Sequence, residues 1–229
     1  MLEAVRPIVL AGKAAPIDQR GRLSAIAKAP LAGPWHLTHT GLVGDEQADL
    51  KNHGGREKAI HHYPFDHYAD WANEIGPHPL LAAKGAFGEN LSTSGWTEHN
   101  VHIGDIVRFG SALLQVSQGR QPCWKLNARF DRRDMSALTQ TRGRTGWYYR
   151  VLEEGDASEH DRLEMVERRH ENWPLSRLTR LLYVDTRHYD ELREMAQIPE
   201  LAEGWRKLAT RRIETRAIED WAPRLTGET

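Results

Sequence analysis

The strongest constraint on the fold is a β-hairpin pattern that runs up to the only cysteine of the chain. Residues 106–118, IVRFGSALLQVSQ, contain two runs of alternating apolar residues on either side of Gly110 and Ser111. Alternation with a period of two, interrupted by a glycine-containing dipeptide, predicts two antiparallel strands joined by a tight turn. Weaker strand patterns lie in residues 35–43, 148–152 and 163–166, and short helical patterns in residues 65–74 and 135–140. Many short strands with few helices predict a mainly β (α+β) domain built as a closed or nearly closed barrel.

The pattern changes in the last quarter of the chain. Apolar residues recur at three- and four-residue spacing in residues 174–183, 188–197 and 201–213, and turn residues separate these segments. This spacing predicts three short amphipathic helices, so we expect a barrel domain over residues 1–168 and a three-helix region over residues 169–229. The charges of the helices are nearly balanced, which favours packing or dimerisation over ligand binding and allows a homodimer.

Composition excludes several classes of protein. The 229 residues carry a net charge of −1, with 28% charged residues, which favours neither direct nucleic-acid binding nor a membrane surface. No run of about 18 apolar residues occurs, and the N-terminal residues lack a signal-peptide pattern. Together with the scarcity of cysteine, these features predict a cytoplasmic protein.

The lone thiol, Cys123, excludes an intrachain disulfide and a four-cysteine metal site. It remains a candidate nucleophile, redox group or single soft metal ligand, and the alternative is a small buried apolar group. Pro122 predicts an extended approach followed by a helix, which would place the thiol in the first helical turn. There the free backbone N–H groups, with Arg120 and Lys125, favour the thiolate.

Basic residues outnumber acidic ones between residues 120 and 150. This local excess indicates an anionic ligand such as phosphate near Cys123, and a solvated surface strip is the alternative. Residues 41–55, GLVGDEQADLKNHGG, have glycines at both ends that let backbone N–H groups approach a ligand, with Lys51 and Arg56 adding positive charge. A polar connector explains the same segment equally well.

Two shorter motifs hold further polar candidates. In AIHHYP, strand alternation would turn only one of His61 and His62 toward a common pocket, and the spacing of the histidines does not favour zinc. In GAFGENLSTSG, Glu89 and Asn90 follow Gly88 and either face a cavity or form a hydrogen-bonded turn.

These motifs together resemble the MOSC domain family, specifically its YiiM-type members with a C-terminal three-helix region. The resemblance is carried, in order, by GLVGDEQADLKNHGG, HHYP, AFGENLSTSG and NVHIGDIVRFGSALLQVSQGRQPCWKLN. It implies a β-barrel that binds the molybdenum cofactor (molybdopterin), with Cys123 as a thiolate ligand to molybdenum. A soft thiolate suits such a metal centre, and the phosphate of the cofactor needs cationic or N–H-rich partners.

The resemblance also implies which residues line the cofactor pocket. These are Ser24, Lys28, His53, Gly54, Gly55, His62, Tyr63, Glu89, Asn90 and Arg120. At Asn52, Gly119, Gln121 and Trp124 relatives vary, and we expect these positions to alter substrate fit more than cofactor binding.

The activity implied by the resemblance is that of a molybdenum-dependent oxidoreductase. It would reduce N-hydroxylated base analogues such as 6-hydroxylaminopurine, with electrons from an external reductase. Pyridoxal phosphate binding is an association of the family only. The alternative is a non-catalytic carrier of the cofactor, or of sulfur as a persulfide on Cys123. A cysteine hydrolase would need His53 or His62 as a base.

Overall fold

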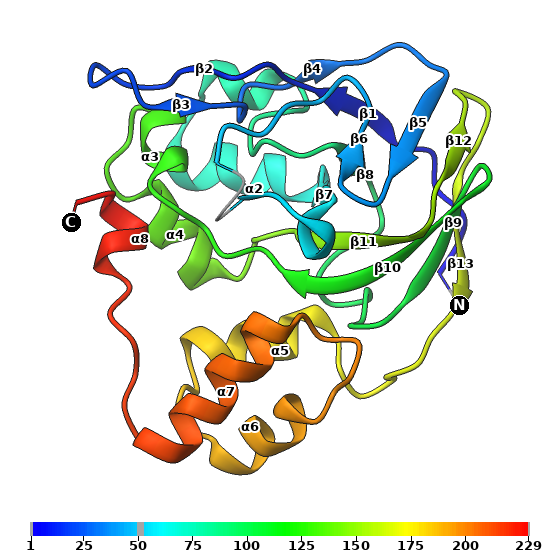
Figure 1. Cartoon of the computed structure of the whole chain (residues 1–229). Coiled ribbons are helices and arrows are strands. Elements are labelled where there is room, and N and C mark those ends of the chain that lie inside the picture. Colours follow the sequence, from blue (N-terminus) through cyan, green and yellow to red (C-terminus); the bar gives the residue numbers. More distant parts are fainter. Residues whose placement is uncertain (1, 50–52, 229) are drawn as a thin grey trace.

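The computed structural model describes residues 2–49 and 53–228. Its strands are β1 (Ile8–Ala11), β2 (Ala15–Pro16), β3 (Leu23–Ser24), β4 (Ala29–Pro30), β5 (Trp35–Thr38), β6 (Gly41–Leu42), β7 (Ile60–Pro64), β8 (Leu91–Thr93), β9 (Ile106–Phe109), β10 (Ala112–Gly119), β11 (Trp147–Glu153), β12 (Gly155–Ala157) and β13 (Leu163–Glu167). Eight of them form one sheet in the order β13-β9-β10-β11-β7-β8-β1-β4, and two small sheets, β12-β5-β6 and β2-β3, lie beside it (Figure 1).

The main sheet curls into a nearly closed barrel. Its neighbouring strands are antiparallel except for β7 and β8, which run parallel. A β-bridge between Val5 and Leu163 joins the segment before β1 to β13 through two backbone hydrogen bonds of 3.1 and 2.8 Å. The predicted barrel is therefore confirmed, and this bridge links β13, at one end of the sheet, to the chain just before β1, near the other end.

The predicted hairpin is also confirmed. Strands β9 and β10 pair antiparallel across Gly110 and Ser111. Gly110 has a φ of +60°, and a Cβ there would collide with the carbonyl oxygen of Asp156. The turn therefore requires glycine, since a side chain would be both strained and crowded.

Most helices lie where periodicity predicts them. The α-helices are α2 (Asp66–Ile75), α3 (Lys125–Arg129), α4 (Met135–Arg142), α5 (Leu175–Tyr183), α6 (Tyr189–Ala196), α7 (Glu203–Thr215) and α8 (Ala222–Thr226), and the 3-10 helices are η1 (Arg56–Lys58) and η2 (Pro79–Ala82). Helices α5, α6 and α7 form the predicted three-helix bundle below the barrel (Figure 1). The short α8 was not predicted, and the chain reaches it by returning from the bundle to the barrel beside α3 and α4 (Figure 1). No described helix is both long and apolar enough to cross a membrane.

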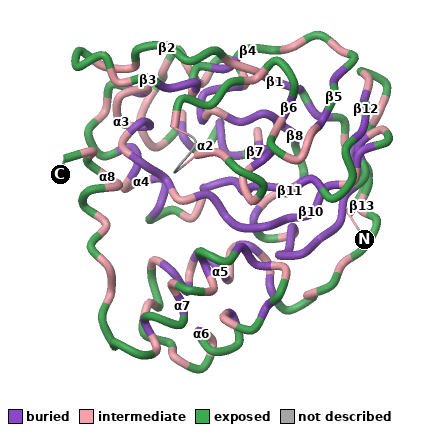
Figure 2. Tube along the Cα trace, in the orientation of Figure 1, coloured by how far each residue is buried: buried purple, intermediate pink, exposed green. Residues whose placement is uncertain are grey.

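Barrel and bundle share one hydrophobic core. Val116 of β10, Leu178 of α5 and Trp205 of α7 all belong to it and are buried (Figure 2). A Cβ on Gly119 would lie 3.0 Å from the Trp205 ring, so the indole packs directly on the strand backbone. A buried aromatic side chain removes roughly 150–250 Å² of surface from water. At about 25 cal/mol per Å² of apolar surface, the Trp205 contact is stabilised by several kcal/mol. The bundle is therefore held on the barrel by apolar packing.

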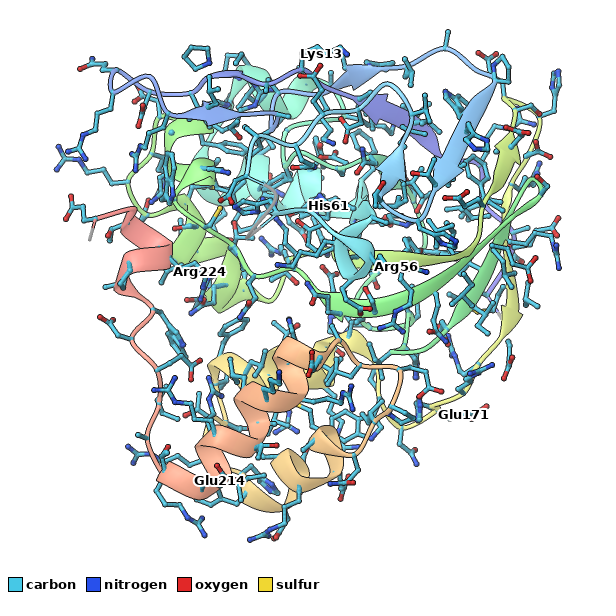
Figure 3. All side chains as sticks on the ribbon, in the orientation of Figure 1. Lys13, Arg56, His61, Glu171, Glu214 and Arg224 are labelled. Carbon is cyan, nitrogen blue, oxygen red and sulfur yellow. The ribbon has the colours of Figure 1, made fainter. Side chains whose placement is uncertain are left out.

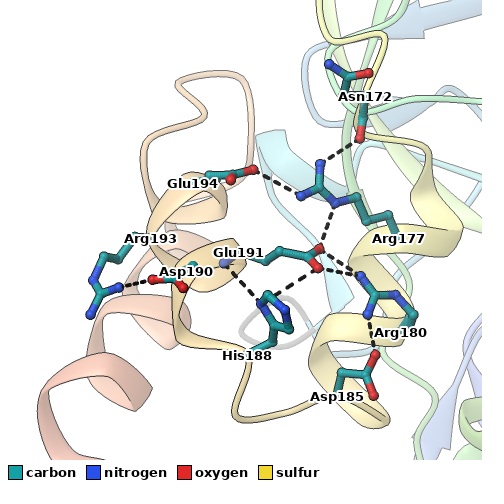
Figure 4. Close-up of polar contacts among 9 residues, drawn as sticks. All are labelled: Asn172, Arg177, Arg180, Asp185, His188, Asp190, Glu191, Arg193 and Glu194. Carbon is teal, nitrogen blue, oxygen red and sulfur yellow. Dashed lines mark hydrogen bonds and ion pairs between the residues drawn. The ribbon is translucent and has the colours of Figure 1, made fainter.

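An ionic network on the outer side of the bundle joins α5 to α6 (Figure 4). Arg177 and Arg180 of α5 both donate to Glu191 of α6, at 2.7 Å each, and Arg177 also pairs with Glu194 at 3.0 Å. The ring of His188 caps the start of α6 by accepting from the Glu191 N–H at 3.5 Å. Because these groups are partly exposed, their main effect is to fix the register of the two helices.

Candidate functional site

Two adjoining cavities meet at Cys123. The inner cavity has a volume of about 40 Å³ and the outer one about 380 Å³. Both are lined by His53, Cys123 and Tyr148. The other polar side chains of the inner wall are Ser24, Lys28, Gln47, His61, Arg120 and Lys125. The outer wall also includes Asp49, Lys58, Gln118, Gln121, Trp124, Pro223 and Arg224.

Cys123 is 6% exposed and lies just before α3. The helix begins at Lys125 and spans only five residues, so the prediction that the thiol lies in the first turn of a helix is wrong. Such a short helix has little dipole to offer. The positive environment of the thiol comes instead from side chains, because Arg120 and Lys125 are both buried in the same wall.

The inner cavity contains buried polar atoms that lack hydrogen bonds. Within the described residues, Arg120 Nη1 and His61 Nε2 are buried and have no hydrogen-bond partner. The Lys28 ammonium lies in the same wall and pairs with the Asp45 carboxylate, and burial lowers the pKa of Lys28. A buried unsatisfied donor costs about 1–3 kcal/mol. An anionic ligand in this cavity would satisfy Arg120 and recover that energy.

His53 faces the thiol as a neutral ring. Its Nε2 lies 3.7 Å from Cys123 Sγ. Burial, followed by the charges of Lys125 and Arg120, lowers the pKa of His53 to about 3. Near pH 7 the imidazole is therefore uncharged and a weak base for the thiol.

Five of the predicted site residues line the inner cavity. They are Ser24, Lys28, His53, Arg120 and Cys123. The Ser24 hydroxyl accepts a hydrogen bond from the Ile26 N–H at 3.2 Å, which fixes the short segment that also carries Lys28.

The pocket histidine is His61 rather than His62. Both belong to β7, and their side chains alternate across the strand as expected. His62 is fully buried, with Nδ1 3.1 Å from the Tyr149 hydroxyl and Nε2 2.8 Å from Thr93 Oγ1. Both of its ring nitrogens are thus used inside the core, whereas His61 lines the inner cavity.

Tyr63 and Glu89 lie behind the cavity wall rather than in it. The Tyr63 hydroxyl donates to the Arg144 carbonyl at 3.0 Å, and its ring stacks on Phe87 with centroids 4.0 Å apart. The Glu89 carboxylate accepts from the backbone N–H groups of Gly85 at 2.8 Å and Phe87 at 3.1 Å. These contacts fix the loop that carries Phe87 into the inner cavity wall.

Asn90 connects two residues of the cavity wall. Its Oδ1 accepts from the His61 N–H at 3.1 Å, and its Nδ2 donates to Asp45 at 2.8 Å. Asp45 in turn pairs with Lys28. The Asn90 amide therefore holds both the backbone of His61 and the carboxylate that pairs with Lys28.

The remaining predicted residues do not line either cavity. Gly54 and Gly55 precede η1, and Gly55 has a φ of +91° that favours glycine. Their role in the structure is to turn the chain after His53. Lys51 and Asn52, considered from the sequence, lie outside the described residues.

The sequence did not predict that residues near the C-terminus contribute to the site. Pro223 and Arg224 line the outer cavity. Arg224 donates to the Pro122 carbonyl oxygen and, at 2.6 Å, to Gln140, while its own carbonyl accepts from the Trp124 N–H at 2.8 Å. Figure 3 shows Arg224 on α8 and His61 inside the barrel. The only local signal was a proline at the start of a short helix.

The residues present fit the molybdenum cofactor. Cys123 offers a soft sulfur donor, Arg120 offers an unsatisfied buried donor, and Lys28 and Lys125 add positive charge beside it. Across residues 2–49 and 53–228, no group of three or more His, Cys, Asp or Glu side chains is arranged to hold a metal ion. Cys123 would hold the metal, and the cationic groups would hold the anionic part of the cofactor.

Comparison with known proteins identifies the family of the chain. A family model described as the MOSC domain matches residues 49–164, and one described as the YiiM-like 3-alpha helix domain matches residues 173–216. "Protein YiiM" of Escherichia coli (strain K12) is 41% identical over 208 residues, which cover 91% of this chain and 92% of that protein. A protein named "Reductase" from Gibberella moniliformis is 41% identical over 177 residues, which cover 77% of this chain but 31% of that longer protein.

Solved structures show the same fold over nearly the whole chain. The crystal structure of YiiM from Escherichia coli matches with a TM-score of 0.83 and 34% identity, covering 97% of this chain and 98% of that one. A crystal structure of YiiM from Geobacillus stearothermophilus matches with a TM-score of 0.75 and 32% identity, covering 90% and 96% of the two chains. The chain therefore belongs to the MOSC domain family and is of the YiiM type, with a YiiM-like three-helix domain after the barrel.

Proposed function

We propose that this protein binds the molybdenum cofactor through Cys123 and reduces N-hydroxylated compounds, base analogues such as 6-hydroxylaminopurine among them. The observation that carries the proposal is the pairing of one buried thiol with the unsatisfied Arg120 Nη1 in a single small cavity. Membership of the MOSC family and the relative named "Reductase" support the same chemistry.

The overall reaction needs two electrons from outside the protein. R–NH–OH, two electrons and two protons give R–NH2 and water, so the N–O bond breaks and the substrate nitrogen is reduced. When bound, the molybdenum cofactor supplies oxygen-atom transfer coupled to two-electron redox change, and an external reductase supplies the electrons.

The side chains have separate tasks in this scheme. Cys123, which borders both cavities, would hold the metal, and Arg120, Lys28 and Lys125 would hold the anionic part of the cofactor. The neutral His53 ring borders both cavities and can hydrogen-bond a substrate without adding charge. Substrate enters through the outer cavity, which has the larger volume.

Metal and pterin analysis tests the proposal directly. Wild-type protein is expressed in a host that makes the cofactor, and molybdenum and the fluorescent oxidised pterin are measured in wild type, Cys123→Ala and the control Ser92→Ala. Ser92 is a buried residue of β8 outside both cavities. We expect wild type and Ser92→Ala to carry molybdenum and to reduce 6-hydroxylaminopurine with an artificial donor, and Cys123→Ala to lose both. Full activity in Cys123→Ala would refute the ligand role.

The same preparation separates the alternatives. Bound cofactor that moves to an apo-acceptor, without reduction of any N-hydroxylated substrate, would indicate a carrier. A cysteine hydrolase is disfavoured because His53, the imidazole beside the thiol, has its pKa lowered to about 3 and is a weak base.

A further inference from the structure

The outer cavity is completed by a part of the chain that lies beyond both matched domains. The YiiM-like three-helix domain ends at residue 216, and residues 217–228 follow it back to the barrel. From this segment, Pro223 and Arg224 enter the wall of the outer cavity. One side of the outer cavity is therefore built by residues far from Cys123 in sequence.

The C-terminal segment is anchored at several points around the thiol. Besides the contacts of Arg224, the Leu225 carbonyl oxygen accepts from Asn127 Nδ2 at 2.7 Å and from the Ser136 hydroxyl at 2.9 Å. The Arg22 guanidinium donates to the Gly227 carbonyl at 3.1 Å and stacks over the Trp124 ring at 3.5 Å. The segment thus fixes the loop after Cys123 from outside, and Trp124 is held between barrel and tail.

The chemistry of the outer wall suits a flat, nitrogen-rich ring. Gln118 and Gln121 bring two amides, each with donors and an acceptor, and Trp124 and Tyr148 bring aromatic surface. A volume of about 380 Å³ lies within the range of small-molecule pockets. Paired amides beside aromatic side chains can read the alternating donors and acceptors on a heteroaromatic edge.

We propose that residues 217–228 form a specificity-determining wall, and that the outer cavity holds the ring of an N-hydroxylated heteroaromatic substrate against Gln118, Gln121 and Arg224. This inference rests on the proposed reductase function and names the residues that recognise the ring of the substrate. It assigns ring recognition to the outer cavity and cofactor binding to the inner one. Changes in the tail should therefore alter ring binding without altering cofactor content.

Equilibrium dialysis with 6-hydroxylaminopurine tests the wall independently of turnover. The full-length protein from a cofactor-competent host is compared with Arg224→Ala, Gln121→Ala and the control Arg211→Ala. Arg211 is an exposed arginine of α7 that lines neither cavity. We expect Kd to rise about tenfold in Arg224→Ala and about fivefold in Gln121→Ala, with no change in Arg211→Ala and equal molybdenum in all four proteins.

A kinetic comparison adds a second readout. Hydroxylamine carries the N–O bond but no ring, so the ratio of kcat/KM for 6-hydroxylaminopurine to that for hydroxylamine should fall in both wall variants. Should Arg224→Ala unfold, Pro223→Ala tests the C-terminal segment in its place, because Pro223 lines the outer cavity from the same segment and its side chain makes no hydrogen bond. Unchanged Kd in the folded wall variants, or no binding by wild type, would overturn the inference. Ring binding without any reduction would instead overturn the proposed function and leave the wall assignment standing.

Discussion

Acidification should destabilise the protein, and the contribution of His62 to this loss follows from its pKa. Burial lowers the pKa of His62 to about 3, against 6.5 when the chain is unfolded. Between these values the unfolded chain binds a proton that the folded chain does not, so the free energy of unfolding falls as the pH falls. Above pH 6.5 the ring is neutral in both states and the effect disappears.

The magnitude follows from the shift. Each pH unit well below 6.5 removes about 1.4 kcal/mol, so His62 alone should account for a loss of about 2 kcal/mol between pH 7 and pH 5. His53 and His61 also have lowered pKa values, and both steepen the loss further. The difference between wild type and a variant without the His62 ring isolates the contribution of that one residue.

Urea unfolding at pH 7, 6 and 5 measures the effect in wild type, His62→Gln and the exposed control His99→Gln. Glutamine keeps a neutral hydrogen-bonding group but does not titrate. We expect His62→Gln to be less stable than wild type at pH 7 and to lose about 2 kcal/mol less on acidification, whereas His99→Gln follows wild type. Parallel losses in wild type and His62→Gln would show that His62 is not a buried neutral ring.

Three further changes test the packing around the site. Gly146→Ala should lower the free energy of unfolding by about 2 kcal/mol, because the φ of Gly146 is +69° and a Cβ there would collide with the His62 carbonyl oxygen. An unchanged urea midpoint would contradict this. Asp105→Asn should lower the free energy of unfolding by about 3 kcal/mol, since the fully buried carboxylate pairs with Arg168 at 2.9 Å. A fall in the melting temperature of less than about 2 °C would contradict this. Arg120→Met should leave the urea midpoint of unfolding unchanged or raised, because Arg120 Nη1 has no hydrogen-bond partner among the described residues. The same variant should retain about tenfold less molybdenum than wild type. Equal molybdenum content in the two proteins would refute the role of Arg120.

The sequence predicts the elements whose pattern is local. The 106–118 hairpin and helices α5 to α7 were predicted correctly because periods of two and of three to four residues report directly on strands and amphipathic helices. Cys123 was identified as a candidate from its surroundings, and the resemblance to the MOSC family implied that Arg120 lines the same pocket; both residues line the inner cavity.

Other features of the site depend on tertiary context. Strand β7 is buried on both faces, so its sequence pattern does not show whether His61 or His62 faces the cavity. Glu89 and Asn90 are buried polar residues. The sequence does not show whether such a residue contacts a ligand or hydrogen-bonds the backbone of the cavity wall, as these two do. Arg224 contacts the carbonyl of Pro122, 102 residues earlier in the chain, and no local sequence pattern reports such a contact.

The bridge between Val5 and Leu163 sets an order of events during synthesis. The two residues lie near opposite ends of the barrel sequence, so their pairing closes a very long loop and carries a large entropic cost. A ribosome must therefore release almost the entire barrel sequence before the N-terminal segment finds its partner strand. Until then the edge of β9 that β13 will cover, and the backbone around Val5, have unpaired groups available to other chains. We expect the nascent protein to be most prone to aggregation in this interval, and slower translation after residue 163 to reduce it.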